Sequence, residues 1–297
     1  MSEGQAYGLV LAQAAGEDAT FAKIWQWTRT HLQRGDGLLS YHADASGRVL
    51  DPQPASDADL LIAWTLLRAT GPDAAALHAD GRRVAAAVLA EETTRAPDGG
   101  LLLTAGPWAT GRPATLNPSY WALPVLRDLG SLTADRRWDD MAAAAVSSTS
   151  QITDGGRLLP PDWAALPASG AARPEPSPNG GQGQPQYGLD AQRTVVWFAA
   201  DCDQRARVLA AAWWSLLKDP ARQRPIALGL QGAVINAAAA PLPYVAAAAA
   251  ARAAGDQTAS TSLLEQAAAQ QRMSPTYYGG AWSALGPMYI GRASGGC

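Results

Sequence analysis

The sequence predicts an all-α protein whose helices are arranged in pairs. Helical patterns of apolar residues recur along the chain and are separated by breaks that contain Gly, Pro or Asp. Patterns typical of strands are confined to short stretches between the helices. The helices also alternate between apolar ones and ones with a charged face. A helix that is apolar on nearly every side is surrounded by other elements, whereas a charged face indicates an outer helix.

The helical segments can be placed in chain order. Eleven are expected, at about 2–15, 20–33, 55–69, 73–92, directly after 117–121, and at 135–149, 189–200, 204–217, 242–254, 258–271 and 277–290. We expect short strands within 38–50 and 95–116, a long loop at about 165–187, and no clear class for 222–241. Eleven is one fewer than the twelve helices of an (α/α)6 barrel, so we predict such a barrel with its first helix missing before Ser2. The alternative is a generic helical bundle. We expect one domain over residues 1–297.

Composition excludes several classes of function. The 297 residues carry a net charge of −3, so no basic surface for nucleic acid is expected. The 2 cysteines and 3 histidines have no metal-ligand spacing, and we expect no metal site and no cofactor. No apolar run is long enough for a transmembrane helix, and no signal peptide is visible. Trp is abundant, with 11 residues against 2 Phe, and indole rings suit sugars as well as protein cores.

The helix at 55–69 begins with two acidic residues. Ser56 is expected to be its N-cap, and Asp57 and Asp59 lie in the first turn, where the helix dipole favours carboxylates. These acids are either solvated capping residues or part of a site. In an (α/α)6 barrel the inner helices run parallel, so their first turns meet at one end. We therefore expect a common cleft formed by residues of five first turns: Glu3, Asp57, Tyr120, Asp190 and Tyr277.

Carboxylates in an aromatic-lined cleft fit the hydrolysis of glycosides. One carboxylic acid protonates the leaving oxygen, and a second carboxylate activates water or attacks the sugar. The acid has to stay protonated near neutral pH, although a first turn favours its charged form. Burial or a neighbouring negative charge, such as Asp57 beside Glu3, can outweigh the dipole because these effects shift a carboxyl pKa by several units.

Five sequence blocks resemble family 8 of the glycoside hydrolases, in particular the endoglucanases encoded beside bacterial cellulose synthases. They are Ser-Glu-Gly-Gln-Ala-Tyr-Gly (2–8), Ala-Ser-Asp-Ala-Asp-Leu-Leu-Ile-Ala (55–63), Leu-Asn-Pro-Ser-Tyr (116–120), Leu-Pro-Pro-Asp-Trp (159–163) and Asp-Ala-Gln-Arg (190–193). Tyr277-Tyr278 resembles the Tyr pair that opens the last inner helix of the family. The chain differs from the family at Leu189, where Tyr is usual, and at Tyr41, where many members have Trp.

The resemblance implies roles for particular residues. Glu3 would be the general acid, Asp190 the general base with Arg193 as its ion-pair partner, and Asp57 a carboxylate that positions the sugar and tunes Glu3. The residues expected to bind substrate are Tyr41, Asn117, Tyr120, Trp163, Arg193 and Tyr277. Trp25, Trp64, Trp213 and Trp214 are expected in the core.

The implied activity is an inverting endo-β-1,4-glucanase, with an acid–base carboxyl separation of about 6.5–9.5 Å. Its partner would be a β-1,4-linked glucan, and the chain would be a monomer. The resemblance also implies a periplasmic or secreted location and a role in trimming glucan beside a cellulose synthase. The alternatives are another β-1,4-glycanase (chitosanase, xylanase or lichenase) and a non-catalytic glucan-binding protein.

Overall fold

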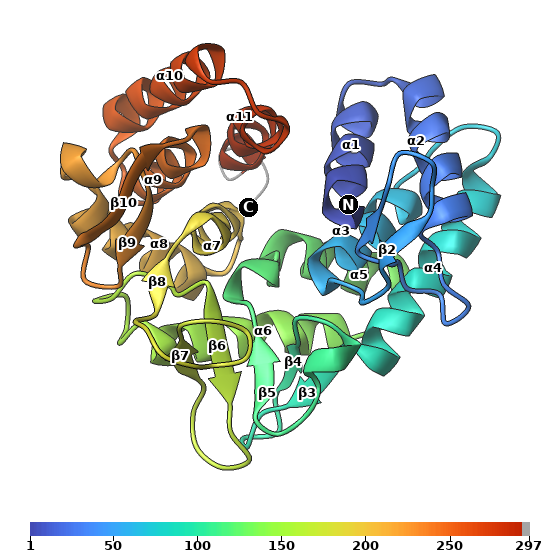
Figure 1. The fold of residues 1–297 in the computed structure, drawn as a ribbon, viewed down its shortest axis with the longest axis horizontal. Coiled ribbons are helices and arrows are strands. Elements are labelled where there is room, and N and C mark those ends of the chain that lie inside the picture. The colour runs from blue at the N-terminus through green and yellow to red at the C-terminus, as the bar shows by residue number, and fades with distance from the viewer. Residues whose placement is uncertain (293–297) are drawn as a thin grey trace. The chain divides into compact units, whose positions relative to one another are not determined.

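The computed structural model describes residues 1–292, and its helices follow the predicted order. Within that range there are eleven α-helices: α1 (Ser2–Ala14), α2 (Asp18–His31), α3 (Ser56–Leu67), α4 (Ala74–Glu91), α5 (Leu123–Thr133), α6 (Arg137–Ile152), α7 (Leu189–Ala200), α8 (Gln204–Leu217), α9 (Pro241–Ala253), α10 (Gln257–Met273) and α11 (Tyr277–Arg292). The expected bounds are confirmed to within a few residues (Figure 1). A 3-10 helix, η2 (Pro118–Tyr120), precedes α5.

Short strands lie between the helices. They are β1 (His42–Ala43), β2 (Val49–Asp51), β3 (Thr93–Arg95), β4 (Leu101–Leu103), β5 (Ala114–Leu116), β6 (Trp163–Leu166), β7 (Arg173–Glu175), β8 (Gln186–Tyr187), β9 (Pro225–Gly229) and β10 (Val234–Ala239). The expected loop over 165–187 is confirmed in part: 167–172 and 176–185 are irregular, but the stretch also contains the end of β6, which pairs antiparallel with β7, and β8, which pairs with β9. The unassigned stretch 222–241 is the β9–β10 hairpin.

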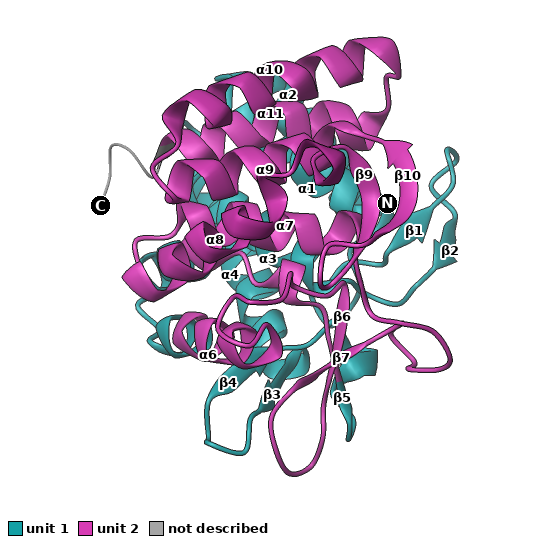
Figure 2. Cartoon of the chain, turned by 90° about the vertical axis from the view of Figure 1, so that its left-hand side faces the viewer, with its two compact units in different colours: residues 1–114, 125–141 teal, residues 115–124, 142–297 magenta. Residues whose placement is uncertain are grey.

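The chain divides into two compact units, which Figure 2 colours separately. Unit 1 comprises residues 1–114 and 125–141, and unit 2 comprises residues 115–124 and 142–297. The chain passes between the units three times, so neither is a continuous segment.

Helix α3 is the centre of unit 1. All 12 of its residues are buried, and it packs against α1 and α4 (Figure 1). The close approach of α4 depends on Gly81, because a Cβ there would lie 2.9 Å from the Leu67 side chain and 3.1 Å from the Ala63 carbonyl oxygen. The prediction that the 55–69 segment is a buried inner helix is confirmed.

The start of α3 differs from the prediction. Ala55 is the N-cap and Ser56 is the first helical residue, so the expected Ser56 N-cap is wrong. The Ser56 hydroxyl instead donates a hydrogen bond to the carbonyl oxygen of Thr104. Asp57 and Asp59 are 6% and 0% exposed, which excludes the interpretation in which these acids are solvated.

Unit 2 is built around α7 and α9. Helix α9 packs against α7, α8, α10 and α11, and residues 245–251 of α9 are all buried. Six of those residues are Ala, and small side chains allow helices to approach closely. Trp213 is buried here, as Trp25 and Trp64 are in unit 1, but Trp214 is only half-buried, contrary to its expected core position. Of the helices in residues 1–292, none has the length and apolar character needed to cross a membrane.

Candidate functional site

Glu3 lies in the first turn of α1, in unit 1. The Tyr7 hydroxyl, one helical turn further on, donates a 2.8 Å hydrogen bond to Glu3 Oε1. Tyr7 is buried, whereas Glu3 is half-buried. The backbone N–H of Ser2 donates to the Tyr41 carbonyl oxygen at 2.8 Å, which ties the start of α1 to the segment that carries Tyr41. The neutral Tyr7 hydroxyl therefore orients one carboxyl oxygen of Glu3.

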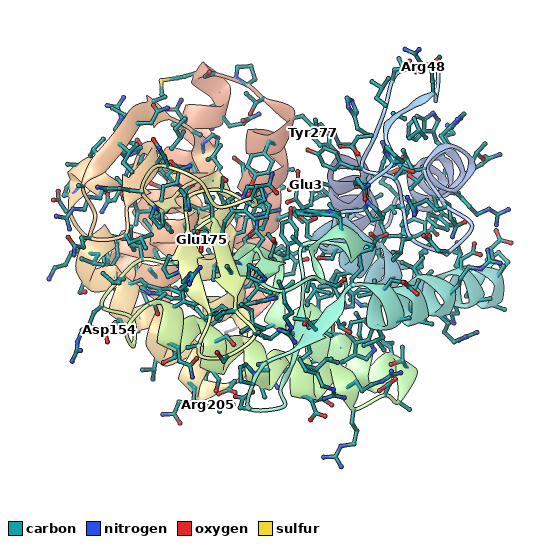
Figure 3. All side chains as sticks on the ribbon, turned by 60° about the horizontal axis from the view of Figure 1, so that its bottom comes forward. Glu3, Arg48, Asp154, Glu175, Arg205 and Tyr277 are labelled. Atoms are coloured by element: carbon teal, nitrogen blue, oxygen red, sulfur yellow. The ribbon has the colours of Figure 1, made fainter. Side chains whose placement is uncertain are left out.

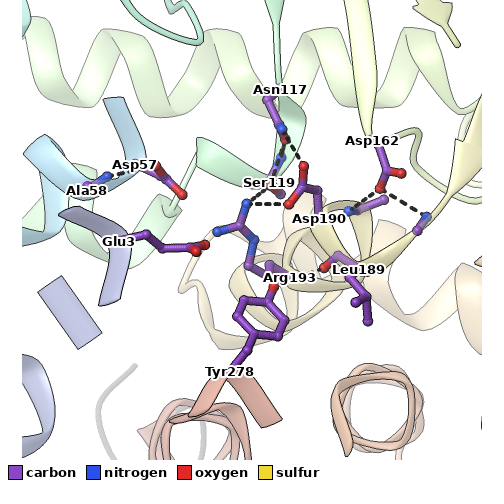
Figure 4. Close-up of polar contacts among 12 residues, drawn as sticks. Glu3, Asp57, Ala58, Asn117, Ser119, Asp162, Leu189, Asp190, Arg193 and Tyr278 are labelled. Atoms are coloured by element: carbon purple, nitrogen blue, oxygen red, sulfur yellow. Dashed lines mark hydrogen bonds and ion pairs between the residues drawn. The ribbon is translucent and has the colours of Figure 1, made fainter. Parts of the chain in front are cut away.

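Asp57 lies in the first turn of α3, in the same unit. Its Oδ1 accepts a 2.8 Å hydrogen bond from the backbone N–H of Ala58. Figure 4 shows the Glu3 and Asp57 carboxyl groups extending from their helices toward the same side. Asp59 has a different role, because its Oδ1 accepts from the buried Leu39 N–H at 2.8 Å. Asp59 lies two residues further into the helix than Asp57.

Asp190 lies in the first turn of α7, in unit 2, and is held by two donors (Figure 4). Arg193 donates from Nη2 to Oδ1 at 3.0 Å, and Asn117 donates from Nδ2 to Oδ2 at 3.1 Å. The predicted Asp190–Arg193 ion pair is confirmed. The Asp190 side chain keeps 35% exposure while that of Arg193 has 3%, so the carboxylate is fixed on its protein side and open on the other.

Arg193 connects Asp190 to two further residues. Its Nη2 also donates to Ser119 Oγ at 2.8 Å, and its guanidinium carbon lies 5.4 Å from the centre of the Tyr120 ring. A guanidinium over an aromatic face is a cation–π contact. Asn117 is buried, and its Oδ1 accepts from the N–H and the hydroxyl of Ser119. In the structure Asn117 and Arg193 thus position Asp190.

Asp162 is a buried carboxyl that was not among the site residues predicted from the sequence. It lies directly before β6, and its Oδ1 accepts from the backbone N–H groups of Gly188 and Ala191 at 3.0 and 2.8 Å (Figure 4). Gln186 Nε2 donates to its Oδ2 at 3.0 Å. Asp162 thus caps α7 directly beside Asp190. Burial, and then the negative charge of Asp190, raise the pKa of Asp162 to about 7.

Aromatic side chains flank the Asp190 network. Tyr120 and Trp163 are half-buried and meet edge to face, with ring centres 6.4 Å apart. The Tyr278 hydroxyl donates to the carbonyl oxygen of Leu189 at 3.2 Å. Tyr277, at the start of α11, is 66% exposed (Figure 3). Half-buried aromatic rings are the type of surface on which sugars stack.

The two groups of predicted site residues belong to different units. Glu3, Tyr41 and Asp57 are in unit 1, and the other predicted site residues are in unit 2. Within each unit, residues distant in sequence come together as expected, such as Asn117 with Asp190. The common cleft for all of them stays a prediction.

Comparisons with known proteins agree with these features. The model of the family "Glycosyl hydrolases family 8" matches residues 1–291. A probable endoglucanase of Novacetimonas hansenii is 33% identical over 209 residues, which is 66% of this chain and 58% of the relative. An endoglucanase of Cellulomonas uda is 30% identical over 203 residues, 67% of this chain and 55% of that protein. The chain therefore spans little more than half the length of these relatives.

Solved structures are similar over nearly the whole chain. The family 8 endoglucanase from Klebsiella pneumoniae has a TM-score of 0.77 and 25% identity, covering 98% of this chain and 90% of its own. The endo-β-1,4-glucanase from Acetobacter xylinum has a TM-score of 0.75 and 28% identity, covering 99% and 89%. These neighbours are (α/α)6 barrels, which confirms the predicted fold class.

Proposed function

Because the chain belongs to family 8 of the glycosyl hydrolases, we propose that it hydrolyses internal linkages of a β-1,4-glucan such as cellulose. The observation that carries the proposal furthest is the Asp190 network. A carboxylate held by Arg193 and Asn117, with one side open, is suited to accept a proton from a water molecule. The relatives at 30–33% identity are endoglucanases by name, which supports the same substrate class.

The proposed reaction is a single displacement with two carboxyl groups. Glu3 donates its proton to the glycosidic oxygen as the bond from that oxygen to the anomeric carbon breaks. A water molecule attacks the anomeric carbon from the opposite face, and Asp190 takes the proton that the water loses. The β-linkage then gives a product that starts as the α-anomer. Asp57 is proposed to position the reacting sugar.

Local contacts support this division of roles. Tyr7 donates a hydrogen bond to one oxygen of Glu3, and this neutral donor orients the Glu3 carboxyl group. Arg193 is an always-charged partner that orients Asp190. Tyr120 and Trp163 are proposed to stack on sugar rings of the bound glucan. Tyr41 and the exposed Tyr277 are proposed to contact sugars further along the chain.

The oligomeric state, location, cofactor requirement and biological role follow from the family resemblance and are also proposals. We propose that the protein is a monomer that acts in the periplasm or outside the cell, without a metal or organic cofactor. Its proposed biological role is to trim glucan during bacterial cellulose production.

The test compares the unmodified chain with Glu3→Gln and Asp190→Asn on carboxymethylcellulose, xylan, lichenan and chitosan. Glu91→Gln and Asp18→Asn make the same chemical changes at exposed positions and serve as matched controls. Release of reducing ends is expected to be greatest on carboxymethylcellulose. Each site variant is expected to lower kcat by roughly 100-fold or more, the usual contribution of acid or base catalysis.

The outcomes separate the alternatives. Equal release of reducing ends by the unmodified chain and the Glu3→Gln/Asp190→Asn double variant would contradict the enzymatic proposal. Binding to cellulose without release would favour the non-catalytic alternative. Faster hydrolysis of xylan, lichenan or chitosan would contradict the proposed substrate.

A further inference from the structure

Two buried carboxyl groups in unit 1 have no role in the proposed reaction. Asp59 is in the first turn of α3, and Glu92 lies between the end of α4 and the start of β3. Both residues are 0% exposed. A charged carboxylate is rarely buried so completely without a charged or hydrogen-bonding partner.

The pair has too few donors for two carboxylates. Asp59 Oδ1 accepts from the Leu39 N–H, but Asp59 Oδ2 and both carboxyl oxygens of Glu92 have no donor among the described residues. The Asp59 carboxyl is, after burial, among the causes that raise the pKa of Glu92, and Thr104 joins the Glu92 backbone to Ser56 in the first turn of α3. Two carboxylate oxygens repel, whereas an acid and a carboxylate form a strong hydrogen bond. A proton on one of the two would therefore satisfy the other.

The surrounding charges also favour a proton on one of the two carboxyl groups. Burial is the first cause that raises the pKa of both carboxyls well above the usual range, and the negative charges of Asp57 and Asp36 act in the same direction. Arg34 opposes this at Asp59, but its guanidinium is ion-paired with Asp36 at 2.8 Å.

We propose that Asp59 and Glu92 share one proton at neutral pH, forming a carboxylic acid–carboxylate hydrogen bond that fastens the start of α3 to the α4–β3 junction. The pair then carries one negative charge in total. Asp59 and Glu92 are positioning residues, because neither is exposed to a substrate.

Backbone contacts extend from the pair to the proposed site residues. Glu92 holds Thr104, whose N–H and hydroxyl both donate to the Glu92 carbonyl oxygen at 2.8 Å, and Thr104 in turn accepts from Ser56. Asp59 holds Leu39, two residues before Tyr41, and the Tyr41 carbonyl oxygen accepts from Ser2. These bonds connect the two segments that carry the pair to the first turns that carry Asp57 and Glu3. Its significance for catalysis rests on the proposed function, but its protonation does not.

The sign of the pH dependence follows from linkage. The folded chain keeps a proton that the unfolded chain releases above about pH 4. Stability from this proton is therefore lost as the pH rises, and the unfolding equilibrium constant increases about tenfold per pH unit for one proton. Glu92→Gln cannot ionise, yet its amide group donates to Asp59. This variant should lack that part of the pH dependence.

The experiment is urea unfolding between pH 5 and pH 8 for the unmodified chain, Glu92→Gln, Asp59→Asn and the exposed neighbour variant Glu91→Gln. Glu92→Gln and Asp59→Asn are each expected to lower the pH slope by about one proton, and Glu91→Gln is expected to keep it. An unchanged slope in Glu92→Gln would overturn the proposal.

Infrared spectroscopy keeps the proposal testable if a variant folds poorly. The protonated-carboxyl band of the unmodified chain at pH 7, to which Asp162 also contributes, should lose the intensity of about one carboxyl group in Glu92→Gln or Asp59→Asn, and an unchanged band would overturn the proposal. In glucan hydrolysis, Glu92→Ala should have a kcat about tenfold lower than that of the unmodified chain, whereas Glu92→Gln should keep the kcat of the unmodified chain. Equal decreases in kcat for the two variants would contradict the positioning role. Inactivity of the unmodified chain would refute the proposed function alone, since unfolding and infrared spectra need no activity.

Discussion

Replacing Asp162 by alanine should destabilise unit 2 far more than replacing it by asparagine. The alanine variant leaves the buried N–H groups of Gly188 and Ala191 without their acceptor. An unsatisfied buried donor costs about 1–3 kcal/mol, so the variant should lose roughly 2–6 kcal/mol of unfolding free energy. Asparagine keeps the Oδ1 acceptor, and the Gln186 amide can rotate to accept from its nitrogen. Asp162→Asn should therefore cost less than about 1.5 kcal/mol.

Urea unfolding followed by Trp fluorescence measures both variants. Asp256→Ala is the matched control, because Asp256 caps α10 through Ala259 at an exposed site and its loss should cost about 1 kcal/mol. Equal losses in Asp162→Ala and Asp162→Asn, or an Asp162→Ala loss no larger than that of Asp256→Ala, would refute the capping role of Asp162.

The same variants test the charge state of Asp162. Its pKa of about 7 is raised from the ordinary value by burial and by Asp190, so the folded chain retains a proton that the unfolded chain releases above about pH 4. Stability from this proton is present at low pH and is lost as the pH rises from about 4 to about 7. Asp162→Asn should lower the slope over this window by up to one proton. Identical slopes would contradict the assigned pKa.

Two further predictions concern the neighbours of the proposed acid and of Asp162. Tyr7→Phe removes the donor to Glu3 and should lower kcat/KM on carboxymethylcellulose about fivefold, since a hydrogen bond between neutral groups contributes about 1 kcal/mol; unchanged initial rates would show that Tyr7 does not orient the acid. Gly188→Ala would place a Cβ 2.2 Å from Asp162 Oδ2 and should cost about 1–3 kcal/mol in urea unfolding, whereas an unshifted midpoint would show that the loop relaxes freely.

The helices were predictable because their signals are local. Helix α7 was predicted with its observed bounds, since Gly188 precedes an apolar helical pattern that ends before Asp201. The short strands were predicted less well. Strands β6 and β7 have three or four residues each, and they form by pairing with one another rather than through local propensity. The Ser56 error has a similar cause, because the carbonyl of Thr104 that binds its hydroxyl is 48 residues away.

The candidate site shows the same distinction between local and distant contacts. The Asp190–Arg193 pair, which the family resemblance implied, is three residues apart on one helix, where side chains are neighbours. The contacts of Asn117 with Asp190 and of Asp162 with Ala191 join residues that are 73 and 29 positions apart. Glu92 has no local feature that marks it as buried beside Asp59, so its role could be found only from the structure.

The configuration of the first product is the most direct test of the account. Proton NMR of cello-oligosaccharide hydrolysis, recorded before the anomers equilibrate, reports which anomer forms first. Single displacement by Glu3, Asp190 and water predicts that the new reducing end starts as the α-anomer. A product that starts as the β-anomer would contradict the proposed mechanism, and no product at all would contradict the proposed activity.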